Sequence, residues 1–212
     1  MTTEKRRLTR RRFLQGCKLT ALGAALAALG GYAYSTRVEP TTLVVERVTV
    51  PIKRLSPTFE GFKIVQMGDF HLHPYTQIDL VQEAVALANS LKPDLVALTG
   101  DYVLESADAI YELAPFLARL VARYGVYSIL GNHDLWTDAR TVATGLEGAG
   151  IPLLVNQGIA VDVGAATIHV AGLDDGWSGK PDLDKALEGL PEGAPTLLLM
   201  HEPDFVDEYA LD

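Results

Sequence analysis

Four short apolar runs stand out in the pattern of hydrophobic and polar positions, and each is followed at once by a polar cluster. Runs of this kind are typical of strands that are buried in a sheet. Each cluster contains Asp, Asn or His, in most cases beside Gly. The runs are residues 63–67, 94–98, 126–130 and 196–200, and the clusters that follow them are Gly-Asp-Phe-His-Leu-His, Thr-Gly-Asp-Tyr, Gly-Asn-His-Asp and His-Glu-Pro-Asp. An earlier stretch, residues 42–52, predicts a further strand that ends near Pro51.

Helical patterns lie between these runs. Residues 76–91 place apolar side chains on one broad face, which predicts an amphipathic helix. Residues 106–125 predict a second helix from an N-cap at Ser106 to Gly125, although Pro115 should kink or divide it. Residues 138–150 predict a shorter helix. The alternation indicates an α/β domain with parallel strands, in which ligands bind at the carboxyl ends of the strands. We therefore expect the four polar clusters to converge on one crevice.

The residue types in these clusters suit a divalent metal. Asp, His and Asn without Cys are typical ligands of Mn, Fe, Zn, Ni or Co. Asp69 and His71 alternate along the chain, so they can share one side of an extended segment. Asp101 has two oxygens with which to bridge two metals, and Asn132 offers a neutral oxygen. Any one of these residues alone is more often a turn or helix cap, and a buried hydrogen-bond network is the alternative for the whole set.

A pair of metals about 3.5–4 Å apart lowers the pKa of a bridging water and holds the attacking and leaving oxygens of a displacement reaction. His133 follows a predicted ligand, so we expect it to protonate or stabilise the leaving oxygen, with Asp134 orienting its ring. His73 lies one step beyond the Asp69 and His71 pair. It is either a residue of the substrate mouth or a solvated loop histidine.

The ordered set of motifs resembles that of the calcineurin-like metallophosphoesterase superfamily, whose motifs are D-x-H, G-D, G-N-H-E/D and a later lone His. The resemblance covers about residues 60–212 and implies an α-β-β-α sandwich of two sheets flanked by helices, with a dinuclear metal centre. By position it implies that Asp69 and His71 bind the first metal, that Asp101 bridges, and that Asn132 and His201 bind the second. His133 matches the catalytic histidine of the family.

One family motif does not occur in this sequence. The superfamily normally completes its site with G-H-x-H, which supplies a His to each metal, and the last histidine here is His201. We therefore expect a fragment of a longer protein that lacks the last strands of the second sheet, and weak metal binding by the chain as given.

The first residues predict export. Thr-Arg-Arg-Arg-Phe-Leu-Gln at residues 9–15 resembles the twin-arginine consensus and departs from it only at Gln15, and an uncharged apolar stretch follows at residues 19–36. The alternative is a basic tail before an ordinary membrane anchor. We expect residues 1–37 to be a twin-arginine signal peptide or membrane anchor, and residues 38–212 to be the metallophosphoesterase domain. This leader is similar to that of the bacterial exported phosphodiesterase branch, the YkuE and YaeI type. Cys17, the only cysteine, precedes the apolar stretch and predicts no lipid anchor.

Charge narrows the choice of substrate. The net charge is −9, but seven of the 18 basic residues and one of the 27 acidic residues lie among the first 18, so the remainder carries −15. Such a body repels nucleic-acid backbones. We expect the substrate to be a small phosphodiester or pyrophosphate, lipid- or nucleotide-linked. We expect the protein to act in the periplasm, in the cell wall or on the outer face of the cytoplasmic membrane, with the twin-arginine translocase as its export partner. An inactive metal- or phosphate-binding envelope protein, and a nuclease or cyclic-nucleotide phosphodiesterase, are the alternatives.

The remaining polar and aromatic residues have simpler interpretations. His169 lies within a strand pattern and is expected to be structural. Asp174 and Asp175 are expected to cap a turn around Gly176. The two tryptophans, Trp136 and Trp177, are interpreted as packing residues, and the acidic run near residues 201–212 as a solvated face.

Overall fold

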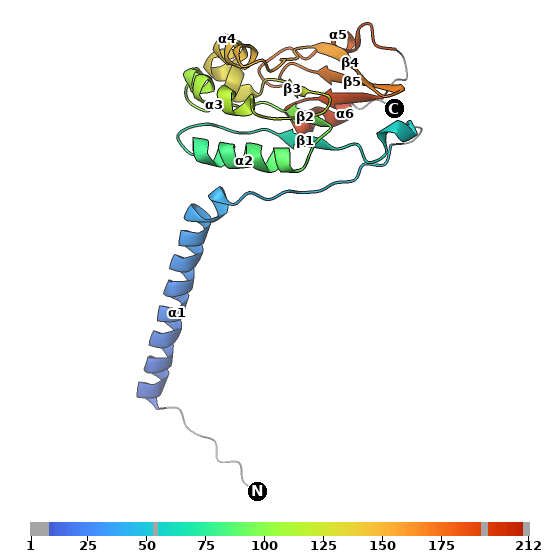
Figure 1. Ribbon diagram of the computed structural model, residues 1–212. Helices are drawn as coiled ribbons and strands as arrows, with labels where there is room; N and C mark the ends of the chain where they lie inside the picture. Colours follow the sequence, from blue (N-terminus) through green and yellow to red (C-terminus); the bar gives the residue numbers. More distant parts are fainter. Residues whose placement is uncertain (1–8, 53–54, 192–194, 210–212) are drawn as a thin grey trace. The chain divides into compact units, whose positions relative to one another are not determined.

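The computed structural model describes residues 9–52, 55–191 and 195–209 (Figure 1). The chain divides into two compact units, Met1–Thr49 and Val50–Asp212. In the first unit, helix α1 spans Arg10–Arg37 and is followed by the 3-10 turn η1 at Glu39–Thr41. No residue of α1 is buried. The helical stretch Arg10–Thr41 has the length and composition of a membrane-spanning segment, a property that export signals near an N-terminus share.

The predicted strand at residues 42–52 does not form. The described backbone there belongs to no strand, and its apolar side chains are exposed, including Val44 at 76% and Val48 at 81%. The apolar residues suit a strand, but a strand is stable only when a neighbour accepts and donates its backbone hydrogen bonds. Among the described residues no strand pairs with this segment, so the prediction is wrong here.

Two three-stranded sheets form the second unit. Strands β1 (Ile64–Met67), β2 (Leu95–Leu98) and β3 (Val126–Ser128) are parallel and lie in that order. Strands β4 (Gln157–Val163), β5 (Ala166–Gly172) and β6 (Thr196–Leu199) form the other sheet, with β4 antiparallel and β6 parallel to β5. All four predicted apolar runs are strands. The fourth run belongs to the second sheet, so its polar cluster reaches the others from a different layer.

Helices cover the outer faces of the two sheets. On one face of β2, Val96 and Leu98 pack with α2 (Ile78–Ser90), α3 (Ile110–Leu117) and α4 (Asn132–Gly148). On its other face, Leu95 and Ala97 pack against side chains of the second sheet. Helix α5 (Leu183–Leu187) covers the outer side of that sheet through Ala186. Short helical turns complete the described fold at Pro57–Phe59, Ala107–Ala109, Pro203–Phe205 and Val206–Tyr209. The expected α-β-β-α sandwich is confirmed.

The helix predicted for residues 106–125 is shorter than expected. It ends at Leu117, two residues after Pro115. The side chain of Asn89 on α2 binds the segment that follows α3. Its Nδ2 donates to the Arg119 carbonyl at 2.9 Å, and its Oδ1 accepts from the Val121 backbone N at 2.8 Å. These bonds replace helical ones, so the proline and a side chain from another helix together end α3.

Helix α4 begins six residues earlier than predicted, at Asn132. The predicted part starts at Asp138, whose extended backbone (φ −161°, ψ 96°) breaks the helix. The Oδ1 of Asp138 accepts from the backbone N of Arg140 and of Thr141, as the side chain of an N-cap residue does. The additional first segment places Asn132 and His133 in the first turn of a helix.

Candidate metal centre

The loops after β1 and β2 hold three predicted ligands in an unusual backbone conformation. Asp69, His71 and Asp101 have φ values of 52°, 43° and 55°, in the left-handed region. Each such residue costs about 1 kcal/mol or more. The two loops hydrogen-bond to each other, from Asp69 N to Gly100 O at 3.0 Å and from His71 N to Asp101 O at 2.9 Å. Tertiary bonds therefore hold these side chains at the carboxyl end of the sheet.

The glycines in the clusters permit close approach of the backbones. A Cβ on Gly100, which has φ 93°, would collide with the backbone of Leu130 and Gly131. A Cβ on Gly131 would collide with the carboxylate of Asp101 and the ring of His201. Only a residue without a side chain lets the loops after β2 and β3 lie this close together.

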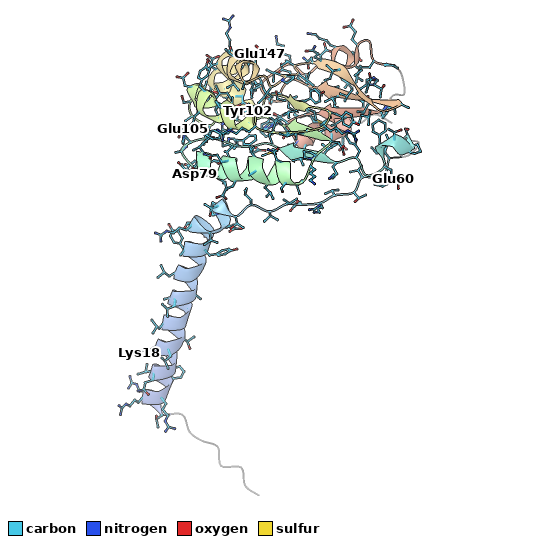
Figure 2. All side chains as sticks on the ribbon, in the orientation of Figure 1. Lys18, Glu60, Asp79, Tyr102, Glu105 and Glu147 are labelled. Atoms are coloured by element: carbon cyan, nitrogen blue, oxygen red, sulfur yellow. The ribbon has the colours of Figure 1, made fainter. Side chains whose placement is uncertain are left out.

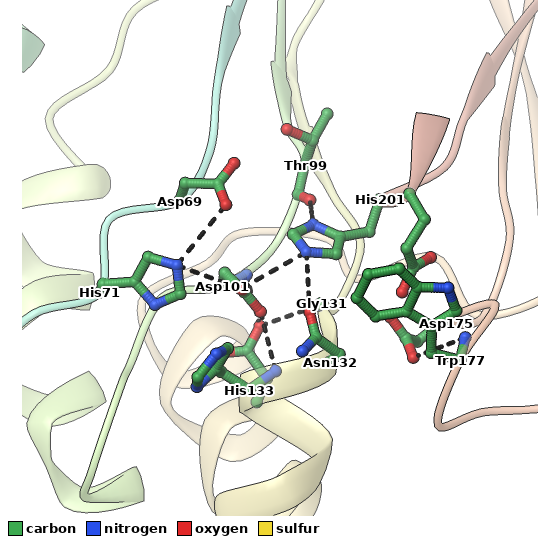
Figure 3. A network of polar contacts seen from close by, with 12 residues as sticks. Asp69, His71, Thr99, Asp101, Gly131, Asn132, His133, Asp175, Trp177 and His201 are labelled. Atoms are coloured by element: carbon green, nitrogen blue, oxygen red, sulfur yellow. Dashed lines mark hydrogen bonds and ion pairs between the residues drawn. The ribbon is translucent and has the colours of Figure 1, made fainter. Parts of the chain in front are cut away.

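Asp101 lies at the centre of the cluster (Figure 3). Its Oδ2 is 3.2 Å from Nε2 of His71 and 3.4 Å from Nε2 of His201. Its Oδ1 accepts from the backbone N of His133 at 2.9 Å. Asp69 lies farther out, with its Oδ1 3.5 Å from the same His71 nitrogen and its side chain 69% exposed. Two predicted ligands, His71 and His201, thus contact one carboxylate.

His201 comes from the second sheet with one ring nitrogen already fixed. Its Nδ1 donates to the carbonyl of Thr99 at 2.7 Å, because a carbonyl oxygen can only accept. Its Nε2 then faces Asp101 and lies 3.2 Å from Oδ1 of Asn132. Histidine ligands of metals usually have their second nitrogen bonded in this way, often to a backbone carbonyl.

The protonation of this pair also indicates a site for a cation. Burial alone would lower the pKa of His201, but its bonds to Asp101 and to the Thr99 carbonyl raise the pKa to about 9. Burial alone would raise the pKa of Asp101, but His201 and the His133 backbone N–H outweigh it, and the pKa is lowered. A proton on His201 thus balances the buried charge of Asp101, and a bound metal would displace that proton.

The described side chains form two groups of possible metal ligands that share Asp101. One contains His71, Asp101 and His133, and the other contains Asp69, Asp101 and His201, with the ligand atoms of each group within 4.8 Å of one another. This differs in detail from the predicted pairing of Asp69 with His71. Carboxylates and imidazoles without thiolates match the donor set of a borderline-hard divalent ion, so these residues fit such a metal.

Asp134 has a different role from the predicted one. It is completely buried, and its oxygens accept backbone N–H groups from Asp101 (2.8 Å), Tyr102 (2.9 Å), Val103 (3.3 Å) and Gly131 (2.9 Å). Burial raises its pKa to about 7 despite these bonds. None of its described bonds goes to the His133 ring, so Asp134 positions the backbone of the site. Asp134 is the N3 residue of α4, and its bond to the backbone N of the N-cap Gly131 is half of a capping box, since Gly131 has no side chain to supply the other half.

His133 lies between a predicted ligand and an aromatic side chain. Its ring is 4.7 Å from that of His71, edge to face, and 4.7 Å from that of Trp136. The packing interpretation of the tryptophans is wrong, because Trp136 is 60% exposed and Trp177 is 61% exposed. His133 therefore lies at the boundary between the polar cluster and an exposed aromatic surface.

The remaining predicted residues lie outside the cluster. The Nε2 of His73 is 2.9 Å from Oε2 of Glu112, in an ion pair whose side chains are 44% and 47% exposed. It belongs to neither group of possible ligands. His169 is buried within β5, as expected of a structural residue.

A buried acid pair beside His201 was not predicted. Asp175 caps the turn around Gly176 as expected, with Oδ1 accepting from the backbone N of Trp177 (3.1 Å) and Ser178 (2.6 Å). Glu202 is also buried, contrary to the solvated face expected there, and accepts from the Gly176 N at 3.0 Å. Burial and the neighbouring Glu202 raise the pKa of Asp175 to about 7, so Asp175 carries the proton that lets the two carboxyl groups lie together.

Comparisons with known proteins agree with this geometry. Residues 62–205 match the sequence profile of the calcineurin-like phosphoesterases. The chain is 32% identical to the uncharacterized metallophosphoesterase YkuE of Bacillus subtilis, over 94% of this chain and 71% of that protein. It is 30% identical to phosphodiesterase YaeI of Escherichia coli, over 93% of this chain and 71% of that protein. It is 32% identical to the bovine transmembrane protein with metallophosphoesterase domain, over 75% of this chain and 39% of that protein. The chain belongs to the calcineurin-like metallophosphoesterase family, whose members are hydrolases that act on phosphoric esters and use divalent metals.

Proposed function

We propose that this protein hydrolyses small phosphodiesters or pyrophosphates with a centre of two divalent metal ions. The observation that carries the proposal is the position of Asp101, which belongs to both groups of possible ligands. A single buried carboxylate with ligands on both sides is suited to hold two ions about 3.5–4 Å apart. The metal is one of Mn, Fe, Zn, Ni or Co, which the donor set does not separate.

The five predicted ligands would hold the two ions: Asp69, His71, Asp101, Asn132 and His201. When bound, such ions supply positive charge for the phosphoryl oxygens and make a water molecule more acidic at neutral pH. A side chain of the protein, and not a metal ion, would supply the proton for the leaving group. His133 is half-buried, beside Asp101 through its backbone, and its ring lies at the exposed edge of the cluster. We assign it the transfer of a proton to the leaving oxygen.

The substrate class follows from charge and from the relatives. The Escherichia coli relative is named a phosphodiesterase. The net charge of −15 after the first 18 residues repels long polyanions, so a small lipid- or nucleotide-linked phosphate is favoured over nucleic acid.

Hydrolysis of bis-p-nitrophenyl phosphate by the Mn²⁺-loaded chain tests the proposal. Asp101→Asn should reduce the rate by at least a hundredfold, since the amide cannot bridge two ions. Asp79→Asn, on the exposed surface of α2 (Figure 2), is the matched control and should keep the rate. At Mn²⁺ concentrations high enough to saturate weak sites, metal analysis should find two Mn²⁺ per chain. Equal rates in the two variants would contradict the assignment of Asp101, and metal uptake without hydrolysis of any phosphoric ester would indicate an inactive binding protein.

We also propose export by the twin-arginine route to the cell envelope. The consensus-like residues 9–15 open helix α1, with Thr9 as its N-cap, and an uncharged apolar stretch follows. The double substitution Arg10→Lys and Arg11→Lys should retain the protein in the cytoplasm. Arg12→Lys, at the variable position of the consensus, should not. Cell fractionation measures both, and equal export of the two variants would contradict this route.

A further inference from the structure

Both tryptophans of the chain are exposed near the candidate metal centre. Trp136 is 60% exposed and Trp177 is 61% exposed, and the sequence contains no other tryptophan. An indole offers a large and rigid apolar face, so an exposed one beside a polar site can contact a ligand there. Figure 3 shows Trp177 on the His201 side of the cluster.

Trp136 is attached directly to the site. It follows His133 by three residues on α4, which places the two side chains on the same side of the helix. Their ring centroids are 4.7 Å apart. The Nε1 of Trp136 donates to Oγ of Ser178 at 2.7 Å, so its polar group is already paired. What remains open to a ligand is an apolar ring surface next to His133.

Ser178, the partner of Trp136, lies in a loop at residues 176–178 whose backbone is bonded to two buried carboxyl groups. The backbone N–H groups of Trp177 and Ser178 donate to Asp175, which is 1% exposed. The next residue back, Gly176, donates to Glu202, which is 4% exposed and adjacent to His201 in the chain. The aromatic surface is therefore anchored to the same strand end that supplies a predicted metal ligand, and it is in place before a ligand binds.

We propose that Trp136, which is bonded to Ser178, the residue after Trp177, is a specificity surface that stacks on a planar aromatic ring in the leaving group of the substrate. The proposal rests on the function proposed above. The His133 ring lies between His71 and Trp136, so a phosphoryl group at the metal centre that directs its leaving oxygen to His133 carries the attached group toward Trp136. Stacking of an aromatic ring on such a side chain is worth about tenfold or more in affinity.

Phosphonates that are not hydrolysed test this on the Mn²⁺-loaded chain. Phenylphosphonate, cyclohexylphosphonate and methylphosphonate share one head group and differ only in the attached group. Their dissociation constants are measured by calorimetry and by tryptophan fluorescence. In Trp177→Phe the emission comes from Trp136 alone, because the chain has only two tryptophans. We expect phenylphosphonate to bind the wild type about tenfold more tightly than the other two ligands and to quench Trp136.

The variants then separate stacking from other causes. Trp136→Ala should abolish the preference for phenylphosphonate and leave the binding of methylphosphonate within about twofold, while Trp136→Phe should keep most of the preference. Tyr111→Ala, an exposed aromatic residue on α3, is the control and should change neither. An equal affinity for phenyl- and cyclohexylphosphonate, or a preference that survives in Trp136→Ala, would overturn the proposal. A wild type that binds none of the three would overturn the proposed function, and this inference with it.

Discussion

Asp101 and Asp134 are both buried carboxylates, and they differ in the groups that face their oxygens. Both oxygens of Asp134 accept backbone N–H groups. Those of Asp101 face the side chains of His71 and His201 and one backbone N–H. Asp101 therefore has side-chain chemistry to offer a ligand, whereas Asp134 has only a positioning role. Residue type alone did not distinguish the two.

Replacing Asp134 should destabilise the fold strongly. Asp134→Ala leaves four buried N–H groups without their acceptor, and we expect a loss of about 3 kcal/mol in the free energy of unfolding. Asp134→Asn keeps one acceptor oxygen and should lose less. Urea unfolding measures both. Asp138→Ala, which removes an exposed helix cap from the same helix, is the control and should cost about 1 kcal/mol. A loss in Asp134→Ala no larger than that of the control would contradict the positioning role.

At the scale of elements, local pattern predicted which strands and helices form near the site better than it predicted their boundaries. The apolar runs correspond to β1, β2, β3 and β6, and the periodic residues 76–91 contain α2. The end of α3 at Leu117 depends on Asn89, 30 residues away in the sequence from the Arg119 carbonyl that it binds. No pattern within residues 106–125 carries that information.

Asn89→Ala should lower the free energy of unfolding by about 1–2 kcal/mol, because the Arg119 carbonyl and the Val121 N–H both lose their partner. Its neighbour Ser90 is exposed, and its hydroxyl donates to the Leu87 carbonyl within the same helix. Ser90→Ala should therefore change the stability by less than about 0.5 kcal/mol. Thermal or urea unfolding of the two variants compares them directly, and similar stabilities would contradict this account of the end of α3.

At the scale of the whole catalytic unit, the site depends on contact between the two sheets. His201 follows β6 of the second sheet, yet its ring bonds to Thr99 and Asp101 after β2 of the first. Because Asp101 balances the charge of a protonated His201, this contact also links the stability of the metal-free protein to pH.

The sign of that dependence follows from the direction of the shift. The pKa of His201 rises from 6.5 to about 9 on folding, so the folded protein holds this proton more tightly. The stabilisation is present in full below pH 6.5 and is lost as the pH rises through 9. In EDTA-treated protein, the wild type should lose on the order of 2 kcal/mol more than His201→Asn over this range. His73→Asn, at the exposed pair with Glu112, should behave as the wild type. Parallel stability curves for the wild type and His201→Asn would contradict the linkage.

The sequence by itself determined the four strands that precede the polar clusters, the residue types of the site and the family, because apolar runs, helical periodicity and ordered motifs are properties of neighbouring residues. It also placed the predicted ligands at strand ends, and a parallel sheet brings such ends together. Tertiary structure alone decided that residues 42–52 remain unpaired, that the fourth strand joins the second sheet, and that Asp134 and Glu202 are buried. It likewise decided that Trp136 is exposed beside His133. Each of these outcomes depends on contacts between residues far apart in the chain, and the local sequence pattern does not predict such contacts.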